Sequence, residues 1–297
     1  MKDILQEIIA NKRKEIAEQK IAVPLQTLVD MGAGQFERPV RSMRKALEES
    51  ATGIIAEFKR KSPSKGWIFP DATVQTVVPA YEKAGASACS ILTDNKFFGG
   101  SLNDLRDARK LANIPLLRKD FIIDEYQLYQ ARIMGADAVL LIAAALTEEE
   151  CSSLTEAAHS LDLEVLLEIH SEDELSYLTP NIDMLGINNR NLGTFHTDVE
   201  NSFRVVKALT PDLSPLPPLH KRGGEKALTP SLVERGLGGE VSRQGGEVSL
   251  ISESGISDTE TIKSLRKEGF RGFLIGETFM KTGQPGESLS QFIKELS

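Results

Sequence analysis

Eight short apolar segments are the feature that most constrains the fold of this 297-residue chain. They begin at Ile54, Ala88, Pro115, Ala138, Glu164, Met184, Val248 and Gly272. Stretches with the apolar spacing of helices lie between them, and several end in Gly-Ala, which suits a helix C-terminus. Strands that alternate with such helices indicate βαβ units and a parallel sheet. Eight units with none left over predict the α/β class and a closed (β/α)8 TIM barrel.

An open, doubly wound sheet is the competing fold, but no Gly-x-Gly-x-x-Gly motif follows the first strand. Barrels of this kind commonly reach this length as one domain, so we expect residues 1–297 to form a single barrel domain. Residues 1–50 precede the first strand and predict an N-terminal helical extension. Ile4, Leu5, Ile8 and Ile9 recur at helix spacing, Pro24 ends this helix, and a second helical piece is expected over 41–49.

Residues 214–247 do not fit the alternation of strands and helices. They are rich in Pro, Gly and charged residues and have little apolar periodicity. Such a composition cannot bury enough apolar surface to offset the entropy of ordering the chain. The sequence therefore predicts a long disordered insertion before strand 7, in the loop after the sixth helix (199–209).

The charge of the chain limits its partners. With 35 Lys and Arg against 43 Asp and Glu, the net charge is −8, which disfavours nucleic acid and anionic membranes. No apolar run approaches the roughly 20 residues of a membrane span, and the N-terminus lacks the apolar core of a secretory signal. Cys89 and Cys151 are too few for a disulfide framework. We expect a cytoplasmic protein with a small-molecule ligand.

Polar side chains interrupt four of the predicted strands. Side chains alternate between the two faces of a barrel strand, and catalytic groups collect at the carboxyl ends. The polar residues that this alternation groups on a face are Glu57 with Lys59, Lys119 with Leu117 and Phe121, Glu168, and Asn188 with Arg190. Taken singly, Lys119 could be a solvated strand end and Glu168 a structural ion-pair partner. Ionisable groups on four apolar strands together indicate an active site.

Glycine-containing turns follow the last two strands, over 252–257 and 274–277. Barrel enzymes often bind phosphate with the loops after strands seven and eight, through backbone N–H groups. Gly255 and Gly276 would let the backbone approach an anion closely. Either turn alone could be an ordinary glycine turn, but the pair predicts a phosphate site.

Several long motifs resemble those of the indole-3-glycerol-phosphate synthase family. They are Ile55–Gly66, Ser90–Asp94 followed by Phe97–Ser101, Leu117–Ile122, Gly186–Leu192 and Ser252–Ile256, in the family's order. The resemblance covers the whole chain except the insertion. It implies a (β/α)8 barrel whose N-terminal helical segment helps to cover the mouth of the active site.

The resemblance also implies an activity, that of a carboxy-lyase of tryptophan biosynthesis. The substrate would be 1-(2-carboxyphenylamino)-1-deoxyribulose 5-phosphate, converted to indole-3-glycerol phosphate by ring closure, decarboxylation and dehydration. No metal and no organic cofactor would be needed. We expect a monomer that can associate with other enzymes of the tryptophan pathway.

The resemblance assigns roles to individual residues. Lys119 would be the general acid on the ribulose carbonyl and hydroxyl, and Glu168 a base or charge stabiliser in the dehydration, with Glu57 and Lys59 assisting. The residues that would hold the substrate are Ser62, Phe98, Phe121, Asn188, Arg190 and Leu274. Those that would hold the phosphate are Lys59, Ser254, Gly255, Gly276 and Glu277. The division of the dehydration step between Lys59 and Lys119 stays open.

Position 277 departs from the family, because some members carry a small hydroxyl residue there. We therefore expect the side chain of Glu277 to turn away from the phosphate while its backbone N–H still binds. The four histidines show no metal-ligand spacing, and His170 is expected at the polar rim.

Two other functions compete with this interpretation. A phosphoribosylanthranilate isomerase is also a phosphate-binding barrel, but it would want a Cys/Asp acid–base pair where the first strand here offers Glu57 and Lys59. A non-catalytic barrel could bind an anionic ligand, but it would not need the set formed by Glu57, Lys59, Lys119 and Glu168.

Overall fold

The computed structural model describes residues 4–191, 193–209 and 248–296, so the predicted insertion at 214–247 lies outside the described residues. Its eight parallel strands form a closed barrel. They are β1 (Ile54–Phe58), β4 (Ala88–Leu92), β5 (Leu116–Lys119), β6 (Ala138–Ile142), β7 (Glu164–Ile169), β8 (Met184–Asn188), β9 (Ser249–Glu253) and β10 (Gly272–Ile275). The barrel closes where β1 pairs with β10, with Ile55 opposite Leu274. Each predicted apolar segment forms one strand, so the predicted fold is confirmed.

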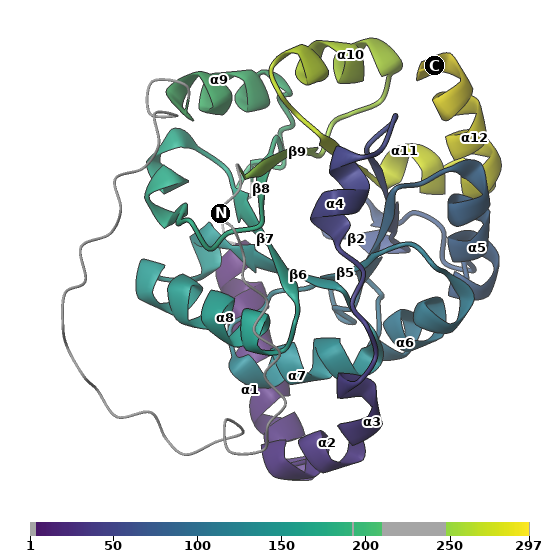
Figure 1. Cartoon of the computed structure of the whole chain (residues 1–297). Helices are drawn as coiled ribbons and strands as arrows, with labels where there is room; N and C mark the ends of the chain where they lie inside the picture. The colour runs from purple at the N-terminus through teal and green to yellow at the C-terminus, as the bar shows by residue number, and fades with distance from the viewer. Residues whose placement is uncertain (1–3, 192, 210–247, 297) are drawn as a thin grey trace.

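Helices surround the barrel (Figure 1). They are α5 (Val74–Ala84), α6 (Leu102–Leu111), α7 (Glu125–Met134), α8 (Glu148–Ser160), α9 (Glu200–Leu209), α10 (Thr259–Lys267), α11 (Glu277–Met280) and α12 (Pro285–Leu296), with short 3-10 helices η1 (Ala143–Ala145) and η2 (Glu172–Tyr177). Gly85 and Gly135 end α5 and α7 in the left-handed conformation, as the Gly-Ala pairs predicted. The connection from β7 to β8 holds only η2 in place of a full helix.

In the described part of the chain, four helices precede the barrel: α1 (Ile4–Ala22), α2 (Leu25–Met31), α3 (Ala33–Phe36) and α4 (Met43–Glu48). Pro24 follows α1 and precedes α2, whereas α2 and α3 were not predicted as separate helices. Met43 and Leu47 of α4 are fully buried in the cluster that contains Ala88 and Ala138, the first residues of β4 and β6. α4 therefore closes the end of the barrel where the strands begin (Figure 1).

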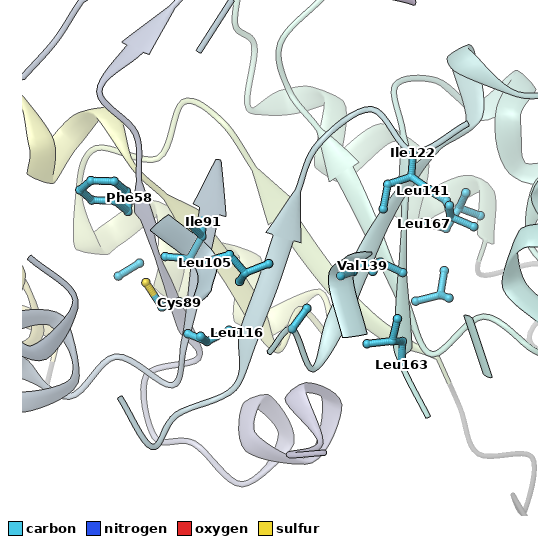
Figure 2. Packing of buried hydrophobic residues seen from close by; sticks show 14 of the residues in the cluster. Phe58, Cys89, Ile91, Leu105, Leu116, Ile122, Val139, Leu141, Leu163 and Leu167 are labelled. Carbon is cyan, nitrogen blue, oxygen red and sulfur yellow. The ribbon is translucent and has the colours of Figure 1, made fainter. Parts of the chain in front are cut away.

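The core has two layers because strand side chains alternate. Interior side chains include Ile55, Leu117, Leu140, Leu166, Ile251 and Leu274. Figure 2 shows part of the outer layer between strands and helices, including Phe58, Cys89, Val139, Leu141 and Leu167. Full burial of such an apolar side chain contributes about 1.5–3 kcal/mol. Both cysteines are buried in this outer layer, as expected for small buried residues rather than nucleophiles.

A small hairpin interrupts the loop between β1 and α5. Its strands β2 (Lys61–Ser62) and β3 (Gly66–Trp67) pair antiparallel, with Ser62 opposite Gly66. The sequence does not predict this hairpin, because two-residue strands carry no periodicity. The hairpin matters for the site because Ser62, Pro63, Ser64 and Lys65 line the cavity described below. Among the described residues, no helix is long and apolar enough to span a membrane.

Candidate active site

A cavity of about 590 Å³ opens at the carboxyl ends of the barrel strands. Its walls come from all eight barrel strands, the β2–β3 hairpin and the start of α1. All the site residues named from the sequence line it: Glu57, Lys59, Ser62, Phe98, Lys119, Phe121, Glu168, Asn188, Arg190, Ser254, Gly255, Leu274, Gly276 and Glu277. The structure thus brings together side chains that lie far apart along the chain.

Lys119 stands between two buried carboxyl groups. Its Nζ lies 2.7 Å from Oε2 of Glu168 on β7 and 3.4 Å from Oε2 of Glu253 on β9. The side-chain amide of Asn188 donates to Oε1 of Glu168 over 3.0 Å. The Glu168 and Glu253 side chains are only 3% and 1% exposed. An ammonium is therefore held inside the barrel at a fixed distance from two possible proton partners.

Burial and neighbouring charges shift the pKa values of Lys119, Glu168 and Glu253 and so decide which of them carries a proton. Burial would lower the pKa of Lys119, but the carboxyls of Glu168, Glu253 and Glu57 raise it well above its usual range. Burial would raise the pKa of Glu168, but the Lys119 ammonium, with His170, lowers it below its usual range. Burial, together with the charge of Glu168, raises the pKa of Glu253 to about 8 although Lys119 opposes this. Near neutral pH, Lys119 is charged, Glu168 is ionised and Glu253 holds a proton.

A second ion pair lies at the end of β1, between Glu57 and Lys59. Nζ of Lys59 is 2.5 Å from Oε1 of Glu57, and both point into the cavity as the strand alternation predicted. Gly276 packs against Glu57, and a Cβ at position 276 would collide with that carboxylate. Gly186 leaves room for Glu253 in the same way. The glycine at the end of β10 is therefore required by a neighbouring acid as well as by any ligand.

The two predicted phosphate turns lie side by side. The hydroxyl of Thr278 donates to the carbonyl of Ile256 over 3.0 Å and joins the start of α11 to the loop after β9. Ser254 and Gly255 both have positive φ, at 68° and 80°, which is uncommon for serine. The amide of Asn189 donates to the Ser254 carbonyl over 3.1 Å and holds this turn.

Arg190 and Glu277 face each other at this end of the cavity. One guanidinium nitrogen of Arg190 donates to Oγ of Ser64 over 2.8 Å, and the other lies 3.5 Å from Oε2 of Glu277. Nζ of Lys65 is 4.0 Å from Oε1 of Glu277. We expected the Glu277 side chain to turn away from the phosphate, but it lines the cavity between two cations. A bound anion would share those cations with this carboxylate.

The opposite side of the cavity is apolar. The rings of Phe98 and Phe121 lie 6.0 Å apart between centroids. Ile4, Leu5 and Ile8 of α1 line the cavity as well, so the N-terminal extension covers part of the mouth. A ligand with a flat apolar end and an anionic end matches this division.

Comparison with known proteins identifies the family. The sequence profile of indole-3-glycerol phosphate synthase matches residues 5–215 and 237–296. An indole-3-glycerol phosphate synthase from Bacteroides thetaiotaomicron is 57% identical over 297 residues, which is 100% of both chains. The chain belongs to the indole-3-glycerol phosphate synthase family. Synthases from Burkholderia ambifaria and Neisseria meningitidis are 38% and 39% identical, over 98% and 95% of this chain and 99% and 95% of theirs.

Solved structures of other barrels share the fold. A mutant tryptophan synthase α-subunit from Pyrococcus furiosus covers 82% of this chain and 97% of its own, with a TM-score of 0.54 and 13% identity. A thiamine phosphate pyrophosphorylase from the same organism covers 86% and 98%, with a TM-score of 0.53 and 15% identity. At such low identity these likenesses concern the barrel alone.

Two residues near the site of this member of the synthase family differ from what its sequence predicted. Glu253 was not named as a site residue, although alternation along β9 puts it on the interior face with Ile251. His170 was expected at the polar rim, but its side chain is only 13% exposed and its Nε2 lies 3.4 Å from Oε1 of Glu168. The alternation rule would have found Glu253, whereas His170 lies beyond the end of β7, where the rule no longer applies.

Proposed function

We propose that this protein is an indole-3-glycerol-phosphate synthase and that the cavity is its active site. The reaction converts 1-(2-carboxyphenylamino)-1-deoxyribulose 5-phosphate to indole-3-glycerol phosphate, CO2 and water. The observation that carries the proposal is the Lys119 ammonium, 2.7 Å from Glu168 and 3.4 Å from Glu253, inside a cavity with one aromatic and one cationic end. Family membership supports the same activity.

Ring closure needs an acid at the ribulose carbonyl, because the aromatic ring carbon is a weak nucleophile. The Lys119 ammonium is suited to this role, since its charge is held by two carboxyl groups and it lines the cavity. As the carbon–carbon bond forms, the carbonyl oxygen takes a proton from Lys119 and becomes a hydroxyl. Such general acid catalysis typically contributes about 10²–10⁴-fold.

Decarboxylation and dehydration then complete the indole ring. The ring carbon that bears the carboxylate is tetrahedral after closure, and loss of CO2 returns its bonding electrons to the ring. Loss of water needs an acid on the new hydroxyl and a base for the proton on nitrogen. Glu168 is ionised and lies beside Lys119, so we propose it as the base. Glu253 holds a proton at neutral pH and can return one to Lys119.

The two ends of the cavity would bind the two ends of the substrate. We propose that Phe98, Phe121 and Leu274 hold the anthranilate ring and that Asn188 and Arg190 hold its carboxylate, with Ser62 beside them. The phosphate would lie against the turns at Ser254, Gly255, Gly276 and Glu277, with Lys59 as a cation. Because the Glu57–Lys59 pair packs against Gly276, we assign Lys59 to the phosphate end and Lys119 to the carbonyl.

The competing isomerase is disfavoured by the position of the cysteines. Cys89 and Cys151 lie in the outer core layer, and neither lines the cavity. Neither thiol is therefore placed to serve as the acid of a Cys/Asp pair. A barrel that only binds an anion would not need a buried ammonium with two carboxyl partners, which costs desolvation free energy.

One assay separates these functions. The full chain is incubated with 1-(2-carboxyphenylamino)-1-deoxyribulose 5-phosphate while indole fluorescence and released CO2 are followed. We expect one CO2 for each indole-3-glycerol phosphate formed. An isomerase would give neither signal with this compound, and a binding protein would give neither while still retaining it.

The setting of the reaction is also a proposal. We propose that the protein works in the cytoplasm as one barrel domain over residues 1–297, as a monomer able to associate with other tryptophan-pathway enzymes. The net charge of −8 supports a soluble small-molecule enzyme. Light scattering on the purified chain would test the monomer, since a mass of about twice 32.6 kDa would show a dimer.

A further inference from the structure

A lysine of the N-terminal helix is buried where α1 meets the barrel. Lys12 is only 5% exposed, and its Nζ lies 2.9 Å from Oδ2 of Asp94, 3.0 Å from Oδ1 of Asp120 and 2.9 Å from Oε2 of Glu15. Burial would lower the pKa of Lys12, but Asp120 and Asp94 raise it well above its usual range. Lys12 is therefore a permanent charge that α1 inserts among acids of the barrel.

The two aspartates stand beside the catalytic end of the barrel. Asp94 follows β4, and its Oδ1 accepts a hydrogen bond from the backbone N–H of Phe97 over 2.8 Å. Asp120 directly follows Lys119, and its Oδ1 accepts from the backbone N–H of Phe121 over 2.8 Å. The carboxylates that hold Lys12 thus also hold the backbone of the aromatic side of the cavity.

Two cations and two buried anions form the centre of this cluster, and the partly exposed Glu15 adds a third anion beside Lys12. Oδ2 of Asp120 accepts from the guanidinium of Arg118 over 3.0 Å and from the Thr93 hydroxyl over 2.6 Å. Lys12 and Arg118 therefore face Asp94 and Asp120, two cations against two buried anions. A buried ion pair of this kind is weak evidence for stability, because desolvation offsets the attraction, but it can fix one packing arrangement against others.

The same helix places apolar side chains in the cavity. Leu5, Ile8 and Lys12 share one face of α1, since they follow the i, i+3, i+7 spacing, and Ile4, Leu5 and Ile8 line the cavity. With a rise of about 1.5 Å per residue, Lys12 lies roughly 6 Å along the helix from Ile8. Fixing Lys12 therefore fixes where Leu5 and Ile8 stand over the aromatic side.

We propose that Lys12 is a positioning residue that fastens α1 over the cavity and thereby sets the affinity for substrate. It acts through Leu5 and Ile8 and through the backbone of Phe97 and Phe121, and it does not touch the reacting atoms. This inference rests on the proposed function for its kinetic consequence. Its structural consequence, the attachment of α1, does not depend on any activity.

The matched control lies on the same helix. Lys20 also ties α1 to the barrel, with Nζ 2.6 Å from Oδ2 of Asp124, but its side chain is 43% exposed. Exposed pairs contribute little, so Lys20→Met should leave KM within about twofold. Lys12→Met should raise KM about tenfold or more with kcat within about threefold, because it removes binding that is uniform between ground and transition states.

Amide hydrogen exchange over residues 5–22 gives a readout that needs no substrate. We expect Lys12→Met to speed exchange in α1 while the barrel strands exchange as in the unchanged protein, and Lys20→Met to have little effect. If the unchanged protein fails to turn over the substrate, the proposed function fails while the exchange result still decides the attachment of α1. Unchanged exchange and unchanged KM in Lys12→Met would overturn the inference, as would a fall in kcat alone.

A second variant covers the case in which Lys12→Met does not fold. Asp94→Asn removes one charge of the cluster but keeps an oxygen for the Phe97 N–H, and Lys12 keeps Asp120. It should raise KM and speed exchange in α1 in the same direction by a smaller factor. Wild-type values for both in a folded Asp94→Asn protein would count against Lys12 as a positioning residue.

Discussion

Glu57 packs against Gly276 across the junction of the first and last barrel strands, in the space that a side chain at position 276 would need. The φ of Gly276 is −121°, which any residue can adopt, so space and not backbone strain requires the glycine. The Glu57 carboxylate in turn holds Nζ of Lys59 at 2.5 Å. The absence of a Cβ at position 276 therefore determines where the Glu57–Lys59 ion pair lies in the cavity.

This relationship predicts the effect of Gly276→Ala. The new methyl group should displace Glu57 and with it Lys59, and misplacement by about 1 Å can cost about 100-fold in rate. We expect kcat/KM to fall by that order while circular dichroism stays native. Gly34→Ala is the matched control, because a Cβ at position 34 meets nothing within 4 Å. Wild-type kcat/KM in Gly276→Ala would show that the Glu57–Lys59 pair does not matter for turnover.

Variants of the Lys119–Glu168 pair are predicted to lose turnover while they keep most of their affinity for the substrate. Lys119→Ala should abolish turnover with only a modest change in substrate affinity, and Glu168→Gln should lower kcat by about 10²–10⁴-fold. Lys61→Ala is a suitable control, since its ammonium bonds the Lys96 carbonyl in the loop after β4. Steady-state kinetics with circular dichroism decides the matter. A kcat near wild type in Lys119→Ala would remove it from the mechanism.

The buried acid Glu253 predicts how stability depends on pH. Its pKa is raised by burial to about 8, so the folded protein keeps a proton that the unfolded chain releases above its ordinary pKa of 4.5. The folded state therefore binds more protons in this window, and the stability that Glu253 contributes is lost as pH rises from about 5 through 8. Glu253→Gln stays neutral throughout, so its free energy of unfolding should fall less over the same range.

Denaturant titrations at several pH values would measure this difference. Glu295→Gln on the exposed side of α12 is the control and should follow the wild-type pH dependence. Parallel curves for wild type and Glu253→Gln would mean that Glu253 is already ionised at neutral pH, and it would then be unavailable as a proton donor.

The fold was predictable because each barrel strand is a short, continuous apolar segment followed by a stretch with helical spacing. A barrel strand must bury both faces, so each apolar segment was visible, and Gly85 and Gly135 marked helix ends. The alternation of side chains along a strand likewise predicted that Glu57, Lys59 and Glu168 face the interior, where they line the cavity. The positions of the strands, and the face on which each strand residue lies, could therefore be inferred from the sequence.

The contacts between distant segments could not be inferred in this way. The pairing of Lys12 with Asp94 and Asp120 depends on where α1 lies against the barrel, which no local pattern records. The approach of His170 to Glu168 depends on the path of the chain after β7. The position of Glu277 between Arg190 and Lys65 depends on the β2–β3 hairpin, which was not predicted.

The turns after β9 and β10 predict a phosphate dependence. Charge-assisted hydrogen bonds to an anion contribute about 1.5–3 kcal/mol each, so a dephosphorylated substrate analogue should bind weaker by several kcal/mol. Calorimetric titration of both compounds tests this, and a crystal grown with sulfate should hold an ion near Gly255, Gly276 and Lys59. Glu277→Gln should tighten inorganic phosphate severalfold, because it removes a negative charge that lies beside the phosphate turns and near Lys65. Equal affinity for the two analogues would contradict the assignment.

The place of residues 214–247 in the chain predicts that the enzyme keeps its activity when this insertion is removed. It connects α9, which ends at Leu209, to β9, which begins at Ser249, and the family profile passes over residues 216–236. Ser249 pairs with Met184 at the start of β8, and its hydroxyl donates to Oε1 of Glu48 over 2.7 Å. The flanking residues therefore lie at the end of the barrel that α4 closes, opposite the cavity.

Replacing residues 214–247 with a Gly-Ser link should leave the active site unchanged. Connections from helix to strand in such barrels are commonly about 2–6 residues long, so a link of that length suffices. Each doubling of loop length costs only about 0.6 kcal/mol, so the shortened protein should be equally or slightly more stable. Because these loops lie at the stability face, we expect kcat and KM to stay within about twofold. A loss of more than about tenfold in kcat/KM with native circular dichroism would instead mean that the insertion contributes to the site at the other end of the barrel.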